Sequence, residues 1–146
     1  MREKRTNSTY LFKSPNHVGN AVRRKYCSTE RSRIDHFPST ILNHTTLTDL
    51  DLSGNMLTGS LPAEIRQLSR LRTLHISKNR FTGLPAEMGQ LQALEVFDTS
   101  YNQLTGLPHE LGNLTNLKRL ILTGNIFSQQ DLAVILKTLP NVAVER

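Results

Sequence analysis

The sequence predicts an α/β solenoid, a short right-handed superhelix of stacked coils with parallel strands on its concave face and short helical or 3-10 turns on its convex face. Three observations support this prediction. One motif recurs with its leucines, proline and glutamate in place, as LTGSLPAEIRQL at 57–68, FTGLPAEMGQL at 81–91 and LTGLPHELGNL at 104–114. A leucine pattern precedes each copy, and the asparagines that follow this pattern are separated by 24, 23 and 23 residues. A fixed period in the twenties is typical of stacked supersecondary units.

The strand of each coil comes from the pattern Leu-x-x-Leu-x-Leu. Its last two leucines are two residues apart, so in an extended strand they point to one face while the residue between them points to the other. One coil cannot bury its apolar face alone, whereas stacked coils form a continuous core. The predicted core positions are Leu47, Leu50 and Leu52, then Leu71, Leu74 and Ile76, then Leu94, Phe97 and the polar Thr99, then Leu117, Leu120 and Leu122.

An asparagine stands where the chain turns out of each strand, at Asn55, Asn79, Asn102 and Asn125. A buried amide at this point can bond backbone groups that the turn leaves unpaired. We therefore interpret the four asparagines as a structural ladder and not as catalytic or ligand-binding residues.

Short convex segments are expected after these turns. The Thr-Gly pairs at 58–59, 82–83 and 105–106 are expected to permit the bend. Prolines then open each convex segment, and one apolar side chain of each segment returns to the core. The prolines are Pro62, Pro85 and Pro108, and the returning residues are Ile65, Met88 and Leu111.

The pattern L-x-x-L-x-L-x-x-N-x-L with this period resembles the leucine-rich repeat family over roughly residues 34–146. The Leu-Pro-x-Glu motif is similar to that of the Shoc-type, Ras-group class of intracellular repeats and of small bacterial leucine-rich repeat proteins. The first copy, LTGSLPAEI, has one additional residue and resembles the plant extracellular type. The resemblance implies a protein-binding module that is not an enzyme and that typically uses its concave face.

We expect a repeat domain at 34–146 after a basic, mostly disordered tail at 1–33, which has no apolar period. Counting 23 residues back from the first strand places Arg24 and Cys27 where leucines should stand. The expected units of the domain are a degenerate half repeat at 34–46, repeats at 47–70, 71–93, 94–116 and 117–138, and a C-terminal cap strand at 139–146.

At the C-terminus the motif changes to SQQDLAVILKTLPNVAVER. Ser128 followed by Asp131 predicts a helix cap. Apolar residues at i, i+3, i+4 and i+7 predict a true helix in place of the convex turn. A final strand is expected at about 141–145, because Leu139, Val142 and Val144 repeat the strand spacing. The apolar residues of the helix pattern are Leu132, Ile135, Leu136 and Leu139.

The net charge of +6 comes from one part of the chain. Residues 1–36 contain nine Lys and Arg against three Asp and Glu, whereas residues 37–146 contain nine of each. The basic surplus is densest at Arg23, Arg24 and Lys25, which could contact nucleic acid or anionic lipid through charge alone.

The single cysteine, Cys27, cannot form an internal disulfide, which indicates a reducing compartment. No apolar stretch is long enough for a signal peptide or a membrane span. A cytoplasmic location is therefore the expectation.

Strand residues that point away from the core form rows across the predicted concave face. One row reads Asp51, His75, Asp98, Ile121 and Ala143, and a second reads Asp49, Thr73, Val96, Arg119 and Asn141. Outer rows read Ser53, Ser77, Ser100 and Thr123, then Gly54, Lys78, Tyr101 and Gly124. The predicted partner-binding residues are Asp49, Asp51, Thr73, His75, Val96, Asp98, Tyr101, Arg119 and Ile121.

One set of residues could bind a metal or act in catalysis: Asp51, His75 and Asp98. Two carboxylates and an imidazole could weakly hold a divalent metal, and with Ser77 the set contains the residue types of a Ser-His-Asp triad. We favour neighbouring opposite charges on a polar binding surface. An open, solvated row neither excludes water nor supplies oxyanion donors, both of which nucleophilic catalysis needs. No catalytic, cofactor-binding or metal-binding residue is predicted.

The function predicted from these features is a non-catalytic scaffold that binds a protein or peptide through its concave face. In the alternative, the basic tail contacts nucleic acid or anionic membrane and the repeats act as a passive spacer. Five strands offering about five residues each give a face of roughly 400 Å². A standard interface needs about 800 Å² per partner, so weak or peptide-scale binding is expected unless other surfaces contribute.

Overall fold

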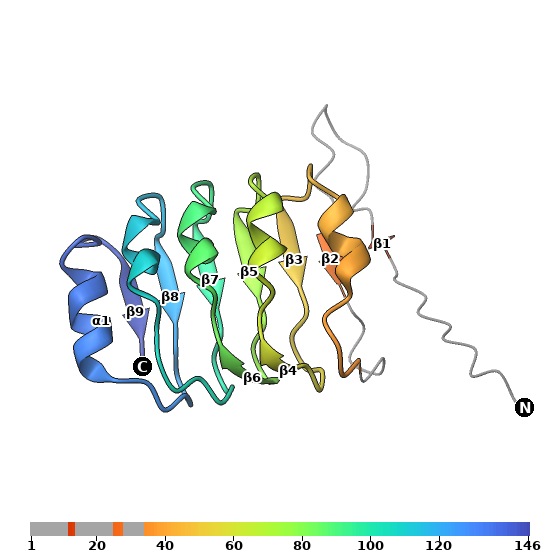
Figure 1. Ribbon diagram of the computed structural model, residues 1–146. Helices are drawn as coiled ribbons and strands as arrows, with labels where there is room; N and C mark the ends of the chain where they lie inside the picture. Colours follow the sequence, from red (N-terminus) through yellow and green to blue (C-terminus); the bar gives the residue numbers. More distant parts are fainter. Residues whose placement is uncertain (1–11, 14–24, 28–33) are drawn as a thin grey trace, which may run out of the picture.

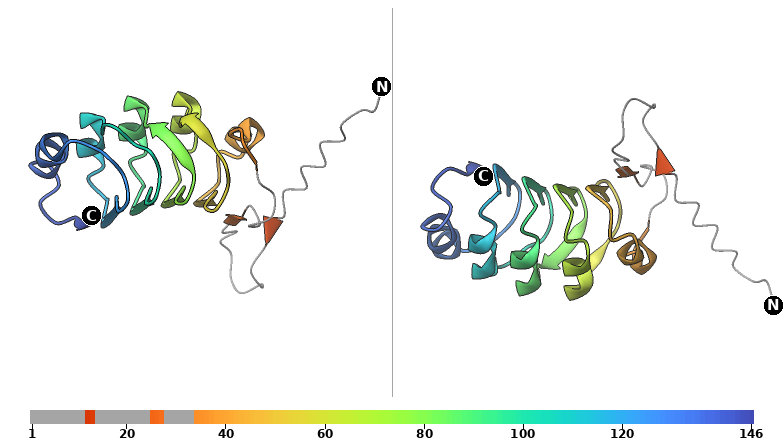
Figure 2. Two further views of the ribbon diagram at one scale, coloured as in Figure 1. Left: turned by 90° about the horizontal axis from the view of Figure 1, so that it is seen from below. Right: turned by 90° about the horizontal axis from the view of Figure 1, so that it is seen from above.

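A computed structural model describes residues 12–13, 25–27 and 34–146 of the chain. Figure 1 shows the coils side by side, with the strands in one layer and the convex turns in another. Seen from below and from above, the coils follow one another along a gently curved row (Figure 2). The predicted solenoid with parallel strands and short turns is confirmed. Its main sheet has the order β1 (Phe12–Lys13), β2 (Lys25–Cys27), β3 (Asp49–Asp51), β5 (Thr73–His75), β7 (Val96–Asp98), β8 (Arg119–Ile121) and β9 (Ala143–Glu145).

The central strands pair in the register that the leucine pattern predicts. Leu50 lies opposite Leu74, Leu74 opposite Phe97, and Phe97 opposite Leu120, all in parallel pairs. These four side chains are fully buried. Equivalent positions one period apart are therefore neighbours in space.

The register of the final strand differs from the prediction by two residues. The strand forms at Ala143–Glu145, within the expected range, but Val144 lies opposite Leu120 and not opposite Leu122. The spacing of Leu139, Val142 and Val144 imitates the strand pattern. A helix replaces the convex turn in this coil, however, and changes the number of residues between β8 and β9.

The first strands lie before the predicted domain boundary at residue 34. β2 pairs in parallel with β3, and Tyr26 lies opposite Leu50. Counting back 23 residues placed Cys27 there, but the sheet uses a separation of 24. β1 pairs antiparallel with β2. The remaining residues of the predicted tail lie outside the described residues.

The asparagine ladder holds successive coils together. The side-chain oxygen of Asn79 accepts a hydrogen bond from the backbone N–H of Leu57 (3.1 Å), one coil earlier. Its Nδ2 donates to the carbonyls of Leu52 (2.9 Å) and Ile76 (3.0 Å). Asn102 and Asn125 repeat this pattern one coil further on each time. Each of these amides thus bonds the backbone of its own coil and of the one before, which confirms the structural role.

The convex layer consists of 3-10 turns with buried anchors. Proline precedes each turn, and one apolar residue of each turn is fully buried, as predicted: Ile65, Met88 and Leu111. The degenerate half repeat has the same arrangement, with Pro38 before its turn and Ile41 buried. The turns are η1 (Ser39–Asn43), η2 (Ala63–Gln67), η3 (Ala86–Gln90) and η4 (His109–Asn113).

Two of the Thr-Gly pairs lie in strands, not in bends. β4 (Thr58–Ser60) and β6 (Arg80–Gly83) form a second, two-stranded parallel sheet between the main sheet and the convex turns. Gly83 packs closely there, because a Cβ would lie 2.5 Å from the Oγ of the exposed Ser60, whose side chain would have to rotate. The interpretation of these glycines as bend residues is therefore wrong for Gly83.

The true helix of the last coil is α1 (Gln129–Leu136). The Oγ of Ser128 accepts a hydrogen bond from the backbone N–H of Gln130 (3.1 Å), which confirms the predicted cap. Leu132, Ile135 and Leu139 are buried, and Leu136 is partly buried. No helix of the described residues is long and apolar enough to cross a membrane.

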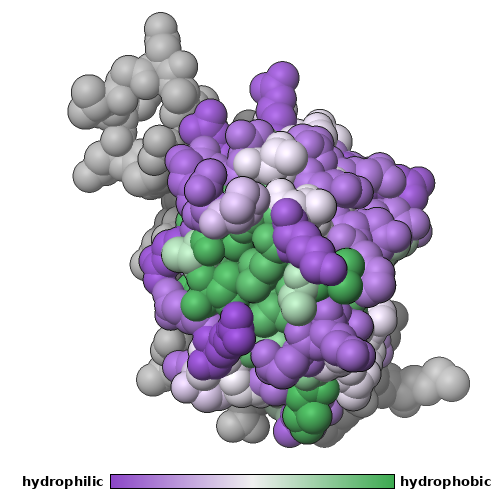
Figure 3. All heavy atoms as spheres, turned by 90° about the vertical axis from the view of Figure 1, so that its left-hand side faces the viewer, coloured by the Kyte–Doolittle hydropathy of each residue, from purple (hydrophilic) through white to green (hydrophobic). Residues whose placement is uncertain are grey.

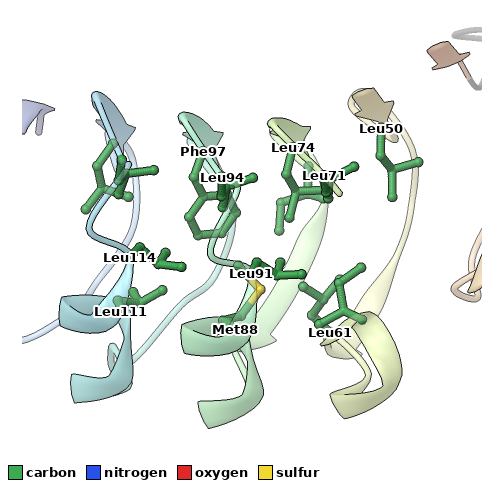
Figure 4. Packing of buried hydrophobic residues seen from close by; sticks show 14 of the residues in the cluster. Leu50, Leu61, Leu71, Leu74, Met88, Leu91, Leu94, Phe97, Leu111 and Leu114 are labelled. Atoms are coloured by element: carbon green, nitrogen blue, oxygen red, sulfur yellow. The ribbon is translucent and has the colours of Figure 1, made fainter. Parts of the chain in front are cut away.

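The core is a row of apolar layers between the main sheet and the convex turns. Figure 4 shows Leu74, Leu94 and Phe97 extending from the strand side toward Leu91 and Met88 on the turn side. At the C-terminal end, apolar side chains are visible within a polar surround (Figure 3). Val144 is only partly buried there, whereas Leu120, its neighbour in the register, is fully buried.

One core position is polar. Thr99 is fully buried in the row of Leu52, Ile76 and Leu122, and its Oγ1 has no hydrogen-bond partner. A buried hydroxyl without a partner costs about 1–3 kcal/mol.

The nearly isosteric Thr99→Val should therefore raise the free energy of unfolding by about 1 kcal/mol, measured by urea denaturation. Thr123→Val, at a partly exposed position, is the control, and a lower denaturation midpoint for Thr99→Val would contradict this account.

Removal of one ladder asparagine should be strongly destabilising. Asn102→Ala leaves the backbone N–H of Phe81 without this partner, whereas the carbonyls of Ile76 and Thr99 still accept from the amides of Asn79 and Asn125. We expect a loss of about 2 kcal/mol in urea denaturation, since one unpaired buried group costs about 1–3 kcal/mol. Asn116→Ala, which removes one exposed bond to Gln92, should cost under about 1 kcal/mol. Equal losses for the two variants would show that the ladder contributes nothing beyond an exposed amide.

Candidate functional site

The candidate site is the outward face of the main sheet, opposite the convex turns. The strand registers place Asp51, His75, Asp98 and Ile121 in one row, as predicted. They place Asp49, Thr73, Val96 and Arg119 in the second row. All of these side chains are partly exposed except Arg119, which is exposed. The rows therefore form one continuous, accessible surface across four strands.

The last member of each row differs from the prediction because of the shifted register of β9. Glu145, and not Ala143, lies beside Ile121, and Ala143 lies beside Arg119. The Arg119 guanidinium pairs with the Glu145 carboxylate at 2.5 Å. Hydrogen bonding to Glu145 and the charge of that carboxylate raise the pKa of Arg119. Glu145 is thus a site residue that the sequence pattern missed.

Asp98 is held by groups from two strands. Its Oδ1 accepts hydrogen bonds from the backbone N–H (3.0 Å) and the Oγ (2.7 Å) of Ser100, and its Oδ2 lies 3.6 Å from Nδ1 of His75. Partial burial alone would raise the pKa of Asp98. Hydrogen bonding to His75 and Ser100, together with the charge of His75, outweighs burial and lowers the pKa to about 2. This carboxylate therefore stays ionised near neutral pH.

Asp51 repeats the local arrangement of Asp98 without the histidine contact. Its Oδ1 accepts from the backbone N–H (3.0 Å) and the Oγ (2.5 Å) of Ser53. Asp49, on the same face of β3, accepts from the Oγ1 of Thr48 (2.7 Å). Neither carboxylate forms an ion pair with any described residue.

Tyr101 lies at the rim, where each coil leaves its strand with a left-handed backbone. Gly54 and Gly124 hold this position in the outer coils (φ 72° and 76°), but Lys78 (φ 55°) and Tyr101 (φ 53°) hold it between them. Such a backbone costs a non-glycine residue on the order of 1 kcal/mol. The Tyr101 ring packs where a Cβ of Gly124 would lie (2.7 Å), yet the residue is 57% exposed. An exposed aromatic side chain is therefore fixed beside the rows.

The structure thus brings together the nine predicted partner-binding residues, eight of them in the two rows and Tyr101 at the rim. Lys25, predicted as part of a basic contact segment, lies in β2 opposite Asp49. Arg23 and Arg24 lie outside the described residues. Among the residues that the structure describes, no group of three His, Cys, Asp or Glu side chains that could hold a metal ion was found.

The chain belongs to the leucine-rich repeat family, since a family model described as a leucine-rich repeat region matches residues 8–143. Leucine-rich repeats generally mediate protein binding and are usually not catalytic. No curated protein sequence matches the chain.

Solved structures with the same fold come from bacteria and plants. The leucine-rich repeat protein LIC12759 of Leptospira interrogans is 39% identical with a TM-score of 0.73, over 78% of this chain and 29% of that one. A chain of the BIR3–SERK2 complex from Arabidopsis thaliana is 28% identical with a TM-score of 0.70, over 89% of this chain and 74% of that one. The ectodomain of the receptor kinase SOBIR1 from Arabidopsis thaliana is 26% identical with a TM-score of 0.67, over 94% and 77%. The chain therefore spans under a third of the Leptospira protein.

The low pKa of Asp98 predicts a pH dependence of stability. The folded-state pKa of Asp98, about 2, is below the ordinary aspartate value of 3.8. Asp98 therefore stabilises the fold fully above about pH 5, and this contribution is lost as the pH falls toward 2. Asp98→Asn should remove about 2 kcal/mol of the acid-dependent loss between pH 5 and 2, measured by urea denaturation at each pH. Ser100→Ala should remove part of this acid-dependent loss of stability. An unchanged slope in Asp98→Asn would contradict the assignment.

Proposed function

We propose that the chain is a non-catalytic interaction scaffold that holds a protein or peptide against the two concave rows and the Tyr101 rim. One observation carries the proposal: four consecutive strands present partly exposed charged and apolar side chains on one continuous face. The general protein-binding role of leucine-rich repeats supports it. The Asp51 and Asp98 carboxylates are oriented by serine bonds before any partner arrives, which lowers the entropic cost of binding.

The expected scale of binding follows from the size of the face. The rows offer roughly 400 Å², which is about half of what a standard protein interface needs on each side. A peptide segment or a small protein surface therefore fits better than a large globular partner. The exposed Tyr101 ring adds the kind of side chain that dominates binding energy at interfaces.

We also propose an intracellular location and a relation to the Shoc-type class of repeats. The Leu-Pro-x-Glu motif in the convex segments and the single cysteine support this proposal. Fractionation of the producing cells, with detection of the native chain, tests it: recovery outside the cell would contradict the intracellular location.

Capture of partners from native extract tests the proposed function. We expect the double variant Asp51→Arg, Ile121→Arg to recover much less crosslinked partner than wild type. The variant reverses the charge at position 51 and places a bulky cation at position 121 of the binding rows. Glu64→Arg combined with Glu110→Arg is the matched control, because these exposed acidic residues lie in the convex turns η2 and η4.

Both variants should first be shown to fold by circular dichroism and urea denaturation. Equal recovery of every partner by wild type, the concave variant and the convex variant would remove the concave face from the proposal. Loss only in the convex variant would move the binding surface to the 3-10 turns.

A further inference from the structure

The charges of the concave face are unevenly matched. At its C-terminal half, Arg119 is paired with Glu145, and in its centre His75 faces Asp98. Asp49 and Asp51, on β3, form no ion pair with a side chain that the structure describes, and Lys25 of β2 lies opposite Asp49 in the register. Both oxygens of an ionised carboxylate accept hydrogen bonds. The Oδ2 of Asp51 accepts none from the described residues, whereas its Oδ1 is held by Ser53.

Two apolar side chains lie at the other half of the same face, beside the Arg119–Glu145 pair. Val96 on β7 and Ile121 on β8 point to the concave side and are partly exposed. They are diagonal neighbours in the two rows, and Tyr101 follows β7 at the rim with 57% of its surface exposed. These side chains cannot be needed for the core, because Phe97 and Leu120 on the same strands already fill it. An apolar side chain of a partner would cover them and be removed from water.

The separation of the two areas sets the spacing of a bound segment. Asp51 and Ile121 occupy the same row on β3 and β8, with β5 and β7 between them. Three steps of about 4.8 Å give roughly 14 Å. An extended chain that crosses the strands advances about 3.3 Å per residue, so this distance corresponds to about four residues.

We propose that the concave face takes an extended peptide segment that carries a basic residue at Asp49 and Asp51 and an apolar residue about four positions away at Val96, Ile121 and Tyr101. The inference rests on the proposed function and adds the chemical class of the partner. An arginine suits the first position, since its guanidinium offers several donors in a plane to oxygens of two carboxylates. Leucine or another large aliphatic side chain suits the second.

The segment does not displace the interactions already present on the face. The His75–Asp98 pair lies between the two areas and provides a polar floor for the residues in the middle of the segment. Charged attraction at Asp51 is partly screened by salt, whereas the apolar contact is not. Binding should therefore weaken with ionic strength without being abolished.

Titration of the ¹⁵N-labelled chain with three synthetic peptides, followed by amide chemical shifts, tests the inference. The first peptide, GRSGSLG, has arginine and leucine four positions apart. The second, GESGSLG, reverses the charge, and the third, GRLGSSG, places leucine next to arginine. We expect GRSGSLG to shift the amides of Asp51, Ile121 and Thr123, and to bind about tenfold more tightly than GESGSLG. We expect a loss of about threefold or more for GRLGSSG.

Matched variants locate the two contacts. Asp51→Asn should weaken GRSGSLG about fivefold and leave GESGSLG unchanged or slightly tighter, whereas Glu110→Gln in a convex turn should change neither. Ile121→Ser should weaken the binding of GRSGSLG and of GESGSLG, the two peptides with leucine at the four-residue spacing. Ile126 lies outside the rows and is 79% exposed, so Ile126→Ser should weaken neither.

Several results would overturn the inference. Equal affinity for the three peptides, shifts confined to convex residues, or no binding of any peptide would each do so. If a partner is nevertheless captured through the concave face, the proposed function stands and only this partner class fails. If the capture experiment also shows no dependence on the concave face, both fail.

Discussion

Stacking of one coil on the next is the constraint on which the rest of the structure depends. A coil of about 23 residues presents apolar side chains that its own residues cannot cover, and the neighbouring coil covers them. The asparagine ladder adds a polar counterpart. Asn79 and Asn102 are almost fully buried, and each bonds backbone groups in two coils. Apolar contact thus drives stacking, and the buried amides fix its register.

The residues that hold the coils together therefore do not lie on the concave face. In each coil the buried strand residue and the asparagine that follows the strand make the contacts between coils, so the outward residues can vary without loss of the fold. The face accordingly contains acidic, basic, apolar and aromatic residues in adjacent coils. The left-handed backbone at Lys78 and Tyr101 also supports a binding role for the outward residues. Glycine holds this position in the neighbouring coils at lower conformational cost, so the side chains of Lys78 and Tyr101 are not needed for the fold.

The sequence predicted the central part of the fold well and the ends less well. Four copies of one pattern determined the pairing of β3, β5, β7 and β8, and therefore eight of the site residues. At β9 the prediction failed because α1 is not the same length as the turns it replaces, so Glu145 was missed. At β2, a separation of 24 in place of 23 moved Tyr26 into the leucine position. The second sheet of β4 and β6 was not predicted, since Thr-Gly alone does not distinguish a bend from a short strand.

The central claim is that outward residues one period apart are neighbours in a defined register. Nuclear Overhauser effects between backbone protons of adjacent strands test it most directly in solution. The account predicts contacts that link Leu74 with Phe97 and Phe97 with Leu120, together with their immediate neighbours in the parallel register. Absence of these contacts, or a set displaced by one residue, would contradict the account, because a shift of one residue turns every concave side chain toward the core.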